Sequence, residues 1–284
     1  MLYGVLHEQE LSPNSEVLVV CSGCTDQTVE LAREYAEKDH RVRVFVENER
    51  KGKASAVNRI LENATGASIV FISADTFPDK GSFARLVSRL SVSNVGIVSG
   101  NPVPIESSDS IFSRLVHVLW LYHDHVFKEL NDSGLARHAS EMFCIRKGIV
   151  DKIPSETVND DAYLALIARK KGWLVKYEPK ARVTISGPKT LLDYLRQRRR
   201  IIFGHYQIRR LTGESPQYLI HLMPLYPKKT LKLTLWLFNE CGISRFLLFM
   251  LIELLLNIVA AADFITGKSF SRWSVATSTK TPFR

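Results

Sequence analysis

Residues that could bind a nucleotide gather in a turn near the start of this chain. The apolar run 17–20 predicts a buried strand and 28–38 predicts a helix, with Ser22, Gly23 and Asp26 in the turn between them. Small residues in such a turn let backbone N–H groups come close to a ligand. In open α/β sheets, ligands bind beyond the carboxyl ends of the strands. The turn therefore indicates a nucleotide-type site.

Two lysines flank a glycine in a second polar turn. Lys51, Gly52 and Lys53 lie between an expected strand at 41–47 and an expected helix at 54–62. Ammonium groups suit a diphosphate electrostatically, and a glycine allows its backbone to come close. A solvated basic turn would have the same composition, so the motif alone leaves both interpretations open.

Acidic residues lie at the ends of two further elements. Asp75 comes shortly after an expected strand at 68–72, and Asp160 and Asp161 open an expected helix at 160–171. A carboxylate at a strand end suits a hard divalent cation, which can bridge the phosphates of a leaving group. A carboxylate can also remove the proton of an attacking hydroxyl. Acidic residues favour helix N-termini in any case. Taken alone, Asp160 and Asp161 are therefore better explained as a helix cap.

These residues need a scaffold of alternating strands and helices. Further helices are expected at 81–90 and 191–210, and further strands at 95–99 and 174–177. This alternation indicates an α/β domain with a mainly parallel sheet. A long aromatic-rich amphipathic segment at 110–130 interrupts the pattern.

Composition and charge restrict the class of protein. The chain has 284 residues, of which 45% are hydrophobic, enough for a full core and too many for a disordered chain. Lys and Arg outnumber Asp and Glu 38 to 29, and this excess suits nucleotide phosphates, anionic lipid headgroups or nucleic acid. The four cysteines lack disulfide-scaffold spacing, which indicates a reducing compartment. Cys21 and Cys24 form a CxxC that also fits a redox turn.

The C-terminal part of the chain is more apolar. The expected organisation is a catalytic domain at 1–210, an amphipathic interfacial segment at 211–243, and a hydrophobic helix with a basic tail at 244–284. The run 246–262 is apolar apart from Glu253 and Asn257, so its free energy of membrane insertion is close to zero. A spanning helix, an interfacial helix and a buried soluble helix all fit it. We expect membrane attachment in one of the first two forms.

Four stretches in this order resemble the family-2 glycosyltransferases, which have a GT-A type nucleotide-sugar-binding fold. They are SGCTDQT at 22–28, KGKASAVN at 51–58, SAD at 73–75 and NDD at 159–161. A fifth stretch, QRRRI at 197–201, resembles the QxxRW motif with isoleucine in place of tryptophan. The resemblance runs from about Glu16 to Gly204.

The resemblance implies a role for each motif residue. Asp75 matches the second aspartate of the DxD motif and would hold a divalent cation, Mg²⁺ or Mn²⁺, whereas Ser73 replaces the first. Asp161 takes the position of the general base, and Asp160 and Gln197 would contact the acceptor. The implied donor-binding set is Ser22, Gly23, Asp26, Lys51, Lys53, Ser73, Asp75 and Arg200.

Together these roles describe a membrane-associated enzyme with its catalytic domain on the cytoplasmic side. It would move a sugar from a nucleoside-diphosphate sugar to a lipid-linked or glycan acceptor in one inverting, metal-dependent displacement. With Ile201 in place of the motif's tryptophan, the acceptor sugar has no indole ring to stack on, so processive synthesis is not expected. Membrane lipids are expected partners. Nucleic acid is not, because the basic stretch lacks an interleaved aromatic platform.

One part of the family pattern has no counterpart here. The opening strand and its P-x-x-N-E turn, which holds the nucleotide base, are not recognisable before Glu16. A chain that starts late, a different base pocket and a degenerate relative would each explain this. The alternative function is therefore a non-catalytic sugar-nucleotide-binding or scaffold protein at the membrane.

Overall fold

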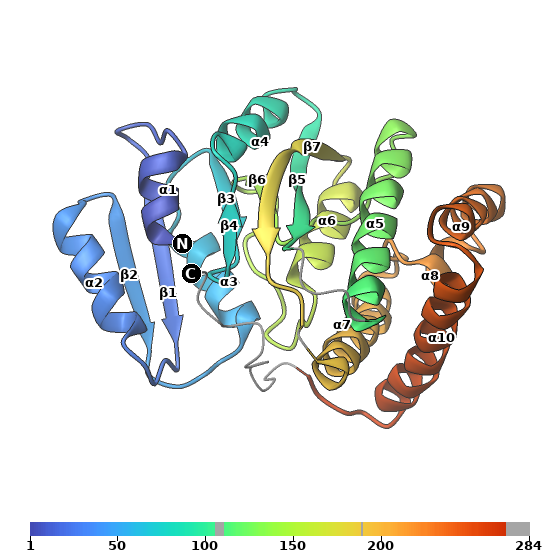
Figure 1. Ribbon diagram of the computed structural model, residues 1–284. Coiled ribbons are helices and arrows are strands. Elements are labelled where there is room, and N and C mark those ends of the chain that lie inside the picture. The colour runs from blue at the N-terminus through green and yellow to red at the C-terminus, as the bar shows by residue number, and fades with distance from the viewer. Residues whose placement is uncertain (106–110, 189, 271–284) are drawn as a thin grey trace.

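The structure is a computed structural model, and it describes residues 1–105, 111–188 and 190–270. The larger of its two sheets lies at the centre and the smaller one lies toward one side, next to α2 (Thr28–Lys38) (Figure 1). The smaller sheet pairs β1 (Val17–Ser22) in parallel with β2 (Val42–Glu47). The larger sheet has the strand order β3-β6-β5-β7-β4. Its strands are β3 (Ser68–Ile72), β4 (Thr76–Pro78), β5 (Val95–Pro104), β6 (Met142–Arg146) and β7 (Leu174–Ile185).

The expectation of a mainly parallel sheet is wrong for the larger sheet. β6 runs antiparallel to both β3 and β5, and β4 runs antiparallel to β7, so β5 and β7 form the one parallel pair among the described strands of this sheet. β6 and β4 were not predicted. β6 is a short apolar run whose pattern gives no direction, and β4 is three residues long. Strand direction depends on a partner distant in sequence, which a local pattern does not reveal.

The expected helices are present near their predicted bounds. They are α2 (Thr28–Lys38), α3 (Lys53–Asn63), α4 (Ser82–Leu90), α6 (Asp160–Lys170) and α7 (Leu191–Thr212). The segments α1 (Leu2–Glu8) and α5 (Ile111–Asp132) are helical as well. The C-terminal part forms α8 (Leu219–Leu222), α9 (Pro227–Cys241) and α10 (Ile243–Ile265). Figure 1 shows α9 and α10 at the edge of the molecule farthest from β1 and β2.

The larger sheet separates two hydrophobic clusters. Consecutive strand residues point to opposite faces, so Ile97 of β5 packs with α3 and α6, whereas Val98 packs with α4. Leu164 of α6 and Leu86 of α4 are fully buried in these two clusters. A sheet covered on both faces is rigid, and it fixes the strand ends that carry the polar residues.

The polar stripe of α10 packs on α7. Arg198 Nε and Nη2 donate to the Glu253 carboxylate over 2.9 and 2.6 Å. Arg199 binds Asp263 in the same two-point manner, at 2.5 and 2.6 Å. The polar residues of this apolar helix are therefore paired inside the protein, as expected of a stripe that faces another helix.

The opposite face of α10 is exposed and apolar. Its residues recur at helical spacing: Ile243, Leu247, Leu251, Leu254, Leu255, Ile258, Val259 and Ile265. By length and composition, α10 is the single helix in the described part of the chain that could cross a membrane.

Candidate active site

The antiparallel strand β6 brings a second acidic residue to the edge of the sheet where β3 ends. Ile72 of β3 pairs with Met142 of β6, so the residues after β3 and the residues before β6 lie side by side. Asp75 follows β3 and Glu141 precedes β6. Burial raises the pKa of Glu141, and nearby carboxylates, including Asp75, add to that shift against the opposing charge of Lys53. Glu141 was not predicted from the sequence.

The N-terminus of α6 adds a buried carboxylate that is paired with a lysine. Asp160 is 2% exposed, and its Oδ1 lies 3.0 Å from Lys53 Nζ at the start of α3. Burial raises the pKa of Asp160, and Lys53 opposes this. Burial by itself would lower the pKa of Lys53, but the facing carboxylates outweigh it and the pKa is raised. Lys53 therefore stays charged, although part of its charge is already balanced by Asp160.

The predicted base, Asp161, is in contact with a histidine. Its Oδ2 lies 3.4 Å from His138 Nε2, and its Oδ1 accepts the Ala162 N–H over 2.7 Å. Burial would raise the pKa of Asp161, but His138, Lys53 and this N–H hold it at about 2. The side chain is 21% exposed, so a substrate can reach the carboxylate.

The three arginines of the QRRRI stretch have different surroundings. Arg198 and Arg199 bind α10, as described above. Arg200 lies near the carboxylates of Glu141, Asp160 and Asp161, which oppose the lowering of its pKa by burial. Gln197 is half-buried on α7, almost one turn earlier. The structure thus brings Arg200 together with Lys53, Asp75, Asp160 and Asp161, all of which were predicted site residues.

The turn after β1 is held by a glutamate that the sequence analysis missed. Glu47 at the end of β2 accepts hydrogen bonds from Ser22 Oγ and Ser55 Oγ, each over 2.6 Å. Ser22 Oγ also accepts the backbone N–H of Lys51 over 3.2 Å, and the Lys51 side chain is exposed. The Ser22 hydroxyl therefore joins the two turns to each other.

Gly23 and Asp26 shape the same turn. Gly23 has a φ of +59°, and a Cβ there would lie 2.6 Å from the backbone nitrogen of Arg50, so the turn requires glycine. Asp26 is exposed, and its Oδ1 accepts the Thr28 N–H over 3.2 Å at the start of α2. Ser73 is half-buried, and its carbonyl accepts the N–H of Thr76.

The residues present fit a divalent cation only if a ligand completes its shell. No group of three or more His, Cys, Asp or Glu side chains within the described residues could hold a metal ion. Asp75 is exposed at the sheet edge and offers carboxylate oxygens. Mg²⁺-type cations are commonly held by one or two carboxylates together with substrate phosphates and water. Asp75 fits such a cation when a diphosphate is bound beside it.

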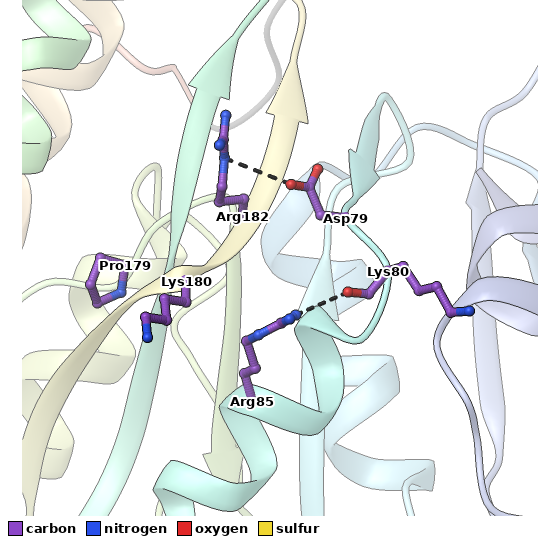
Figure 2. Close-up of a pocket in the computed structure, with 6 residues that line it drawn as sticks. All are labelled: Asp79, Lys80, Arg85, Pro179, Lys180 and Arg182. Atoms are coloured by element: carbon purple, nitrogen blue, oxygen red, sulfur yellow. Dashed lines mark hydrogen bonds and ion pairs between the residues drawn. The ribbon is translucent and has the colours of Figure 1, made fainter.

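A separate basic pocket lies beyond β4. Asp79, Lys80, Arg85, Pro179, Lys180 and Arg182 line it. Figure 2 shows Asp79 directed at Arg182, whose Nε is 3.7 Å from Asp79 Oδ2. This pocket contains none of the predicted site residues. Asp79 is exposed in the structure.

Comparison with known proteins identifies the family. The family model "Glycosyl transferase family 2" matches residues 3–153, which are 151 of the 284 residues. The chain belongs to glycosyl transferase family 2. The match ends before Asp160, Asp161 and Arg200, so those assignments depend on the geometry described above.

Curated relatives of this family-2 protein are similar over part of their length. Glycosyltransferase AglE of Haloferax volcanii is 35% identical over 86 residues, 30% of this chain and 28% of the relative. Poly-beta-1,6-N-acetyl-D-glucosamine synthase of Staphylococcus aureus is 25% identical over 200 residues, 68% of this chain and 48% of the relative. The chain therefore spans less than half the length of these relatives.

Solved structures confirm the α/β GT-A fold class. The mannosyltransferase PcManGT of Pyrobaculum calidifontis, in complex with GDP-Man and Mn²⁺, superposes with a TM-score of 0.66. It is 19% identical, and the match covers 93% of this chain and 82% of that one. The S. aureus TarS structure superposes with a TM-score of 0.54 at 13% identity, and the match covers 94% of this chain and 87% of that one.

Proposed function

We propose that this chain is a glycosyltransferase that moves a sugar from a nucleoside-diphosphate sugar to an acceptor hydroxyl. One observation carries the proposal. The strand end at Asp75, the helix start at Asp161 and the cation Arg200 lie around the same two carboxylates, those of the half-buried Glu141 and the buried Asp160. A transferase of this kind needs positive charge for a departing diphosphate and a base for the attacking hydroxyl, and both are present.

Positive groups would stabilise the leaving diphosphate. A divalent cation, Mg²⁺ or Mn²⁺, held by Asp75 would act as a Lewis acid on the phosphate oxygens. Arg200 and Lys53 would add charge from α7 and α3. Because the charge develops on the diphosphate in the transition state, preorganised cations lower the barrier more than they strengthen donor binding. The complex of PcManGT with GDP-Man and Mn²⁺ supports this use of the fold.

The nucleoside would be held at the turns that follow β1 and β2. Gly23 lets the backbone approach closely, and Asp26 is exposed beside it to accept hydrogen bonds from a ribose or base. Ser22, Ser73 and Lys51 complete this side of the donor site. S. aureus TarS, which has the same fold, was solved in complex with UDP.

Asp161 would receive the proton of the acceptor hydroxyl in a single displacement that inverts the sugar. The acceptor would lie toward α7, next to Gln197 and Asp160. The exposed apolar face of α10 would bind a membrane on the cytoplasmic side, which suits a lipid-linked acceptor or a glycan made at the membrane. We assign 1–210 to the catalytic domain, 211–243 to an interfacial segment and 244–284 to the membrane-associated part. The basic tail of that last part, 271–284, lies outside the described residues.

The proposal is tested by nucleoside-diphosphate release from a panel of UDP- and GDP-sugars with Mn²⁺. We expect Asp161→Asn to lower turnover by about 10²–10⁴-fold with a hydroxyl acceptor or water. The loss should be smaller with a phosphate acceptor, which is already ionised. Asp75→Asn should abolish the dependence on Mn²⁺. Asp79→Asn is the matched control, because this exposed carboxylate lies four residues from Asp75 and should be dispensable. If the wild-type protein binds a donor but releases no nucleoside diphosphate, the non-catalytic alternative is supported instead.

A further inference from the structure

Three histidines surround the predicted base, and one of them touches it. His138 and His205 meet edge to face with ring centroids 5.7 Å apart. His123 stacks on Phe127 at 4.1 Å, and Phe127 lies 6.0 Å from His138. Of these three imidazoles, His138 is the one that lies within reach of the Asp161 carboxylate, at 3.4 Å. The sequence analysis assigned His138 no role.

Asp161 is a weak base in its surroundings. Its Oδ1 already accepts the Ala162 N–H, and its Oδ2 faces His138. Lys53 also stabilises its negative charge. A carboxylate stabilised in this way holds a proton poorly, because each of these contacts favours the ionised form. A proton taken from an acceptor therefore needs a second group on which to rest.

Resting on the proposed function, we infer that His138 is the positioning residue of this base and that the acceptor's proton ends on its Nε2. The acceptor oxygen forms a bond to the anomeric carbon as the bond from that carbon to the diphosphate oxygen breaks. The bonding electron pair leaves with the diphosphate. The hydroxyl proton passes to Asp161 and on to Nε2, which is open when the imidazole carries its hydrogen on Nδ1. The products of this step are a glycoside, a diphosphate and an imidazolium paired with a carboxylate.

Several charged and titratable groups lie around this pair. Lys53, Glu141, Asp160 and Arg200 lie around Asp161. His123 and His205, near His138, are themselves influenced by Arg198. Burial lowers the pKa of His123 to about 3 and lowers that of His205 well below its ordinary value, so both stay neutral at working pH. His138 is the imidazole of this group that a carboxylate contacts.

The test compares His138→Asn and His138→Ala with wild type in the nucleoside-diphosphate release assay, with water as acceptor. We expect kcat to fall by about 10²-fold in both variants, with the donor KM little changed. In wild type, kcat should fall on acidification, because the proposed step needs Nε2 free to accept the acceptor's proton. In His138→Asn the fall of kcat on acidification, the acidic limb of the pH profile, should move to lower pH, because the Asp161 carboxylate is then the base that remains. Added imidazole should restore turnover to His138→Ala but not to Asp161→Asn. His125→Ala is the control, since its ring stacks on Trp236 at 3.6 Å, between α5 and α9.

The outcomes separate this inference from the proposed function. If wild type releases no diphosphate from any donor, the proposed function fails. If wild type is active and His138→Asn keeps its kcat, or keeps its acidic limb at the wild-type pH, the inference fails and the proposed function stands. Failure of imidazole to restore any turnover to a folded His138→Ala protein also overturns the inference, because a purely structural histidine would behave in this way.

Discussion

The ion pair between Arg198 and Glu253 joins α7 to the apolar helix α10, and its removal should have a large, pH-dependent effect on the free energy of unfolding. Both side chains are 10% exposed and are held at 2.9 and 2.6 Å. The Tyr218 hydroxyl donates to Glu253 Oε2 over 3.0 Å as well. The three variants to compare are Arg198→Met, Glu253→Met and the double variant.

The two single variants should differ in how their free energy of unfolding depends on pH. Each leaves one buried charge without its partner, and only the carboxylate can lose that charge by taking up a proton. Arg198→Met strands a carboxylate, which can take up a proton. Neutralising a glutamate of ordinary pKa costs about 3.7 kcal/mol at pH 7 and about 1 kcal/mol at pH 5. We therefore expect the free energy of unfolding to fall by about 3 kcal/mol at pH 7 and by about 1 kcal/mol at pH 5. Glu253→Met strands a guanidinium that stays charged, so its cost of about 3–5 kcal/mol should not shrink on acidification.

The double variant should be close to wild type, within about 1 kcal/mol, because two methionines leave no buried charge. The assay is urea unfolding of the full chain followed by tryptophan fluorescence at pH 7 and pH 5. Arg196→Met is the matched control. It makes the same change at an exposed position of α7 and should cost less than about 0.5 kcal/mol. Single variants that each cost under about 1 kcal/mol, or that respond identically to pH, would show that the pair is not buried as described.

Three further predictions concern backbone fit and the exposed face of α10. Gly23→Ala places a Cβ against the backbone of Arg50 at positive φ, so donor KM should rise at least tenfold while the melting temperature falls; an unchanged KM contradicts the assignment of this turn to the donor. Gly204→Ala places a Cβ 2.5 Å from Asn159 Cγ, so it should shift the start of α6 and lower kcat more than it raises donor KM, as steady-state kinetics can show. Leu254→Glu, on an exposed site, should leave the free energy of unfolding within about 0.5 kcal/mol but reduce flotation with phosphatidylglycerol vesicles; unchanged flotation removes this face from the membrane contact.

Local pattern in the sequence was enough to predict much of this protein. The positions of α2, α3, α4, α6 and α7 follow from apolar periodicity, and those of β1, β2 and β3 follow from short β-branched runs. Motif residues could be placed at strand and helix ends because those ends are local features. The polar stripe of α10 was also visible, since Glu253 and Asn257 are four residues apart.

Tertiary structure decided what those elements bring together. β6 runs antiparallel to β3, and this alone places Glu141 beside Asp75, 66 positions earlier in the chain. His138 lies in an irregular segment with no periodic pattern, so only packing could show its contact with Asp161. Three adjacent arginines on α7 have different partners, because a helix turns successive side chains through about 100°: Arg198 and Arg199 bind α10, and Arg200 lies near the carboxylates of the candidate site. Each residue's preference for helix or strand can be read from the sequence. Charge pairing and strand direction depend on partners that only the folded chain brings close.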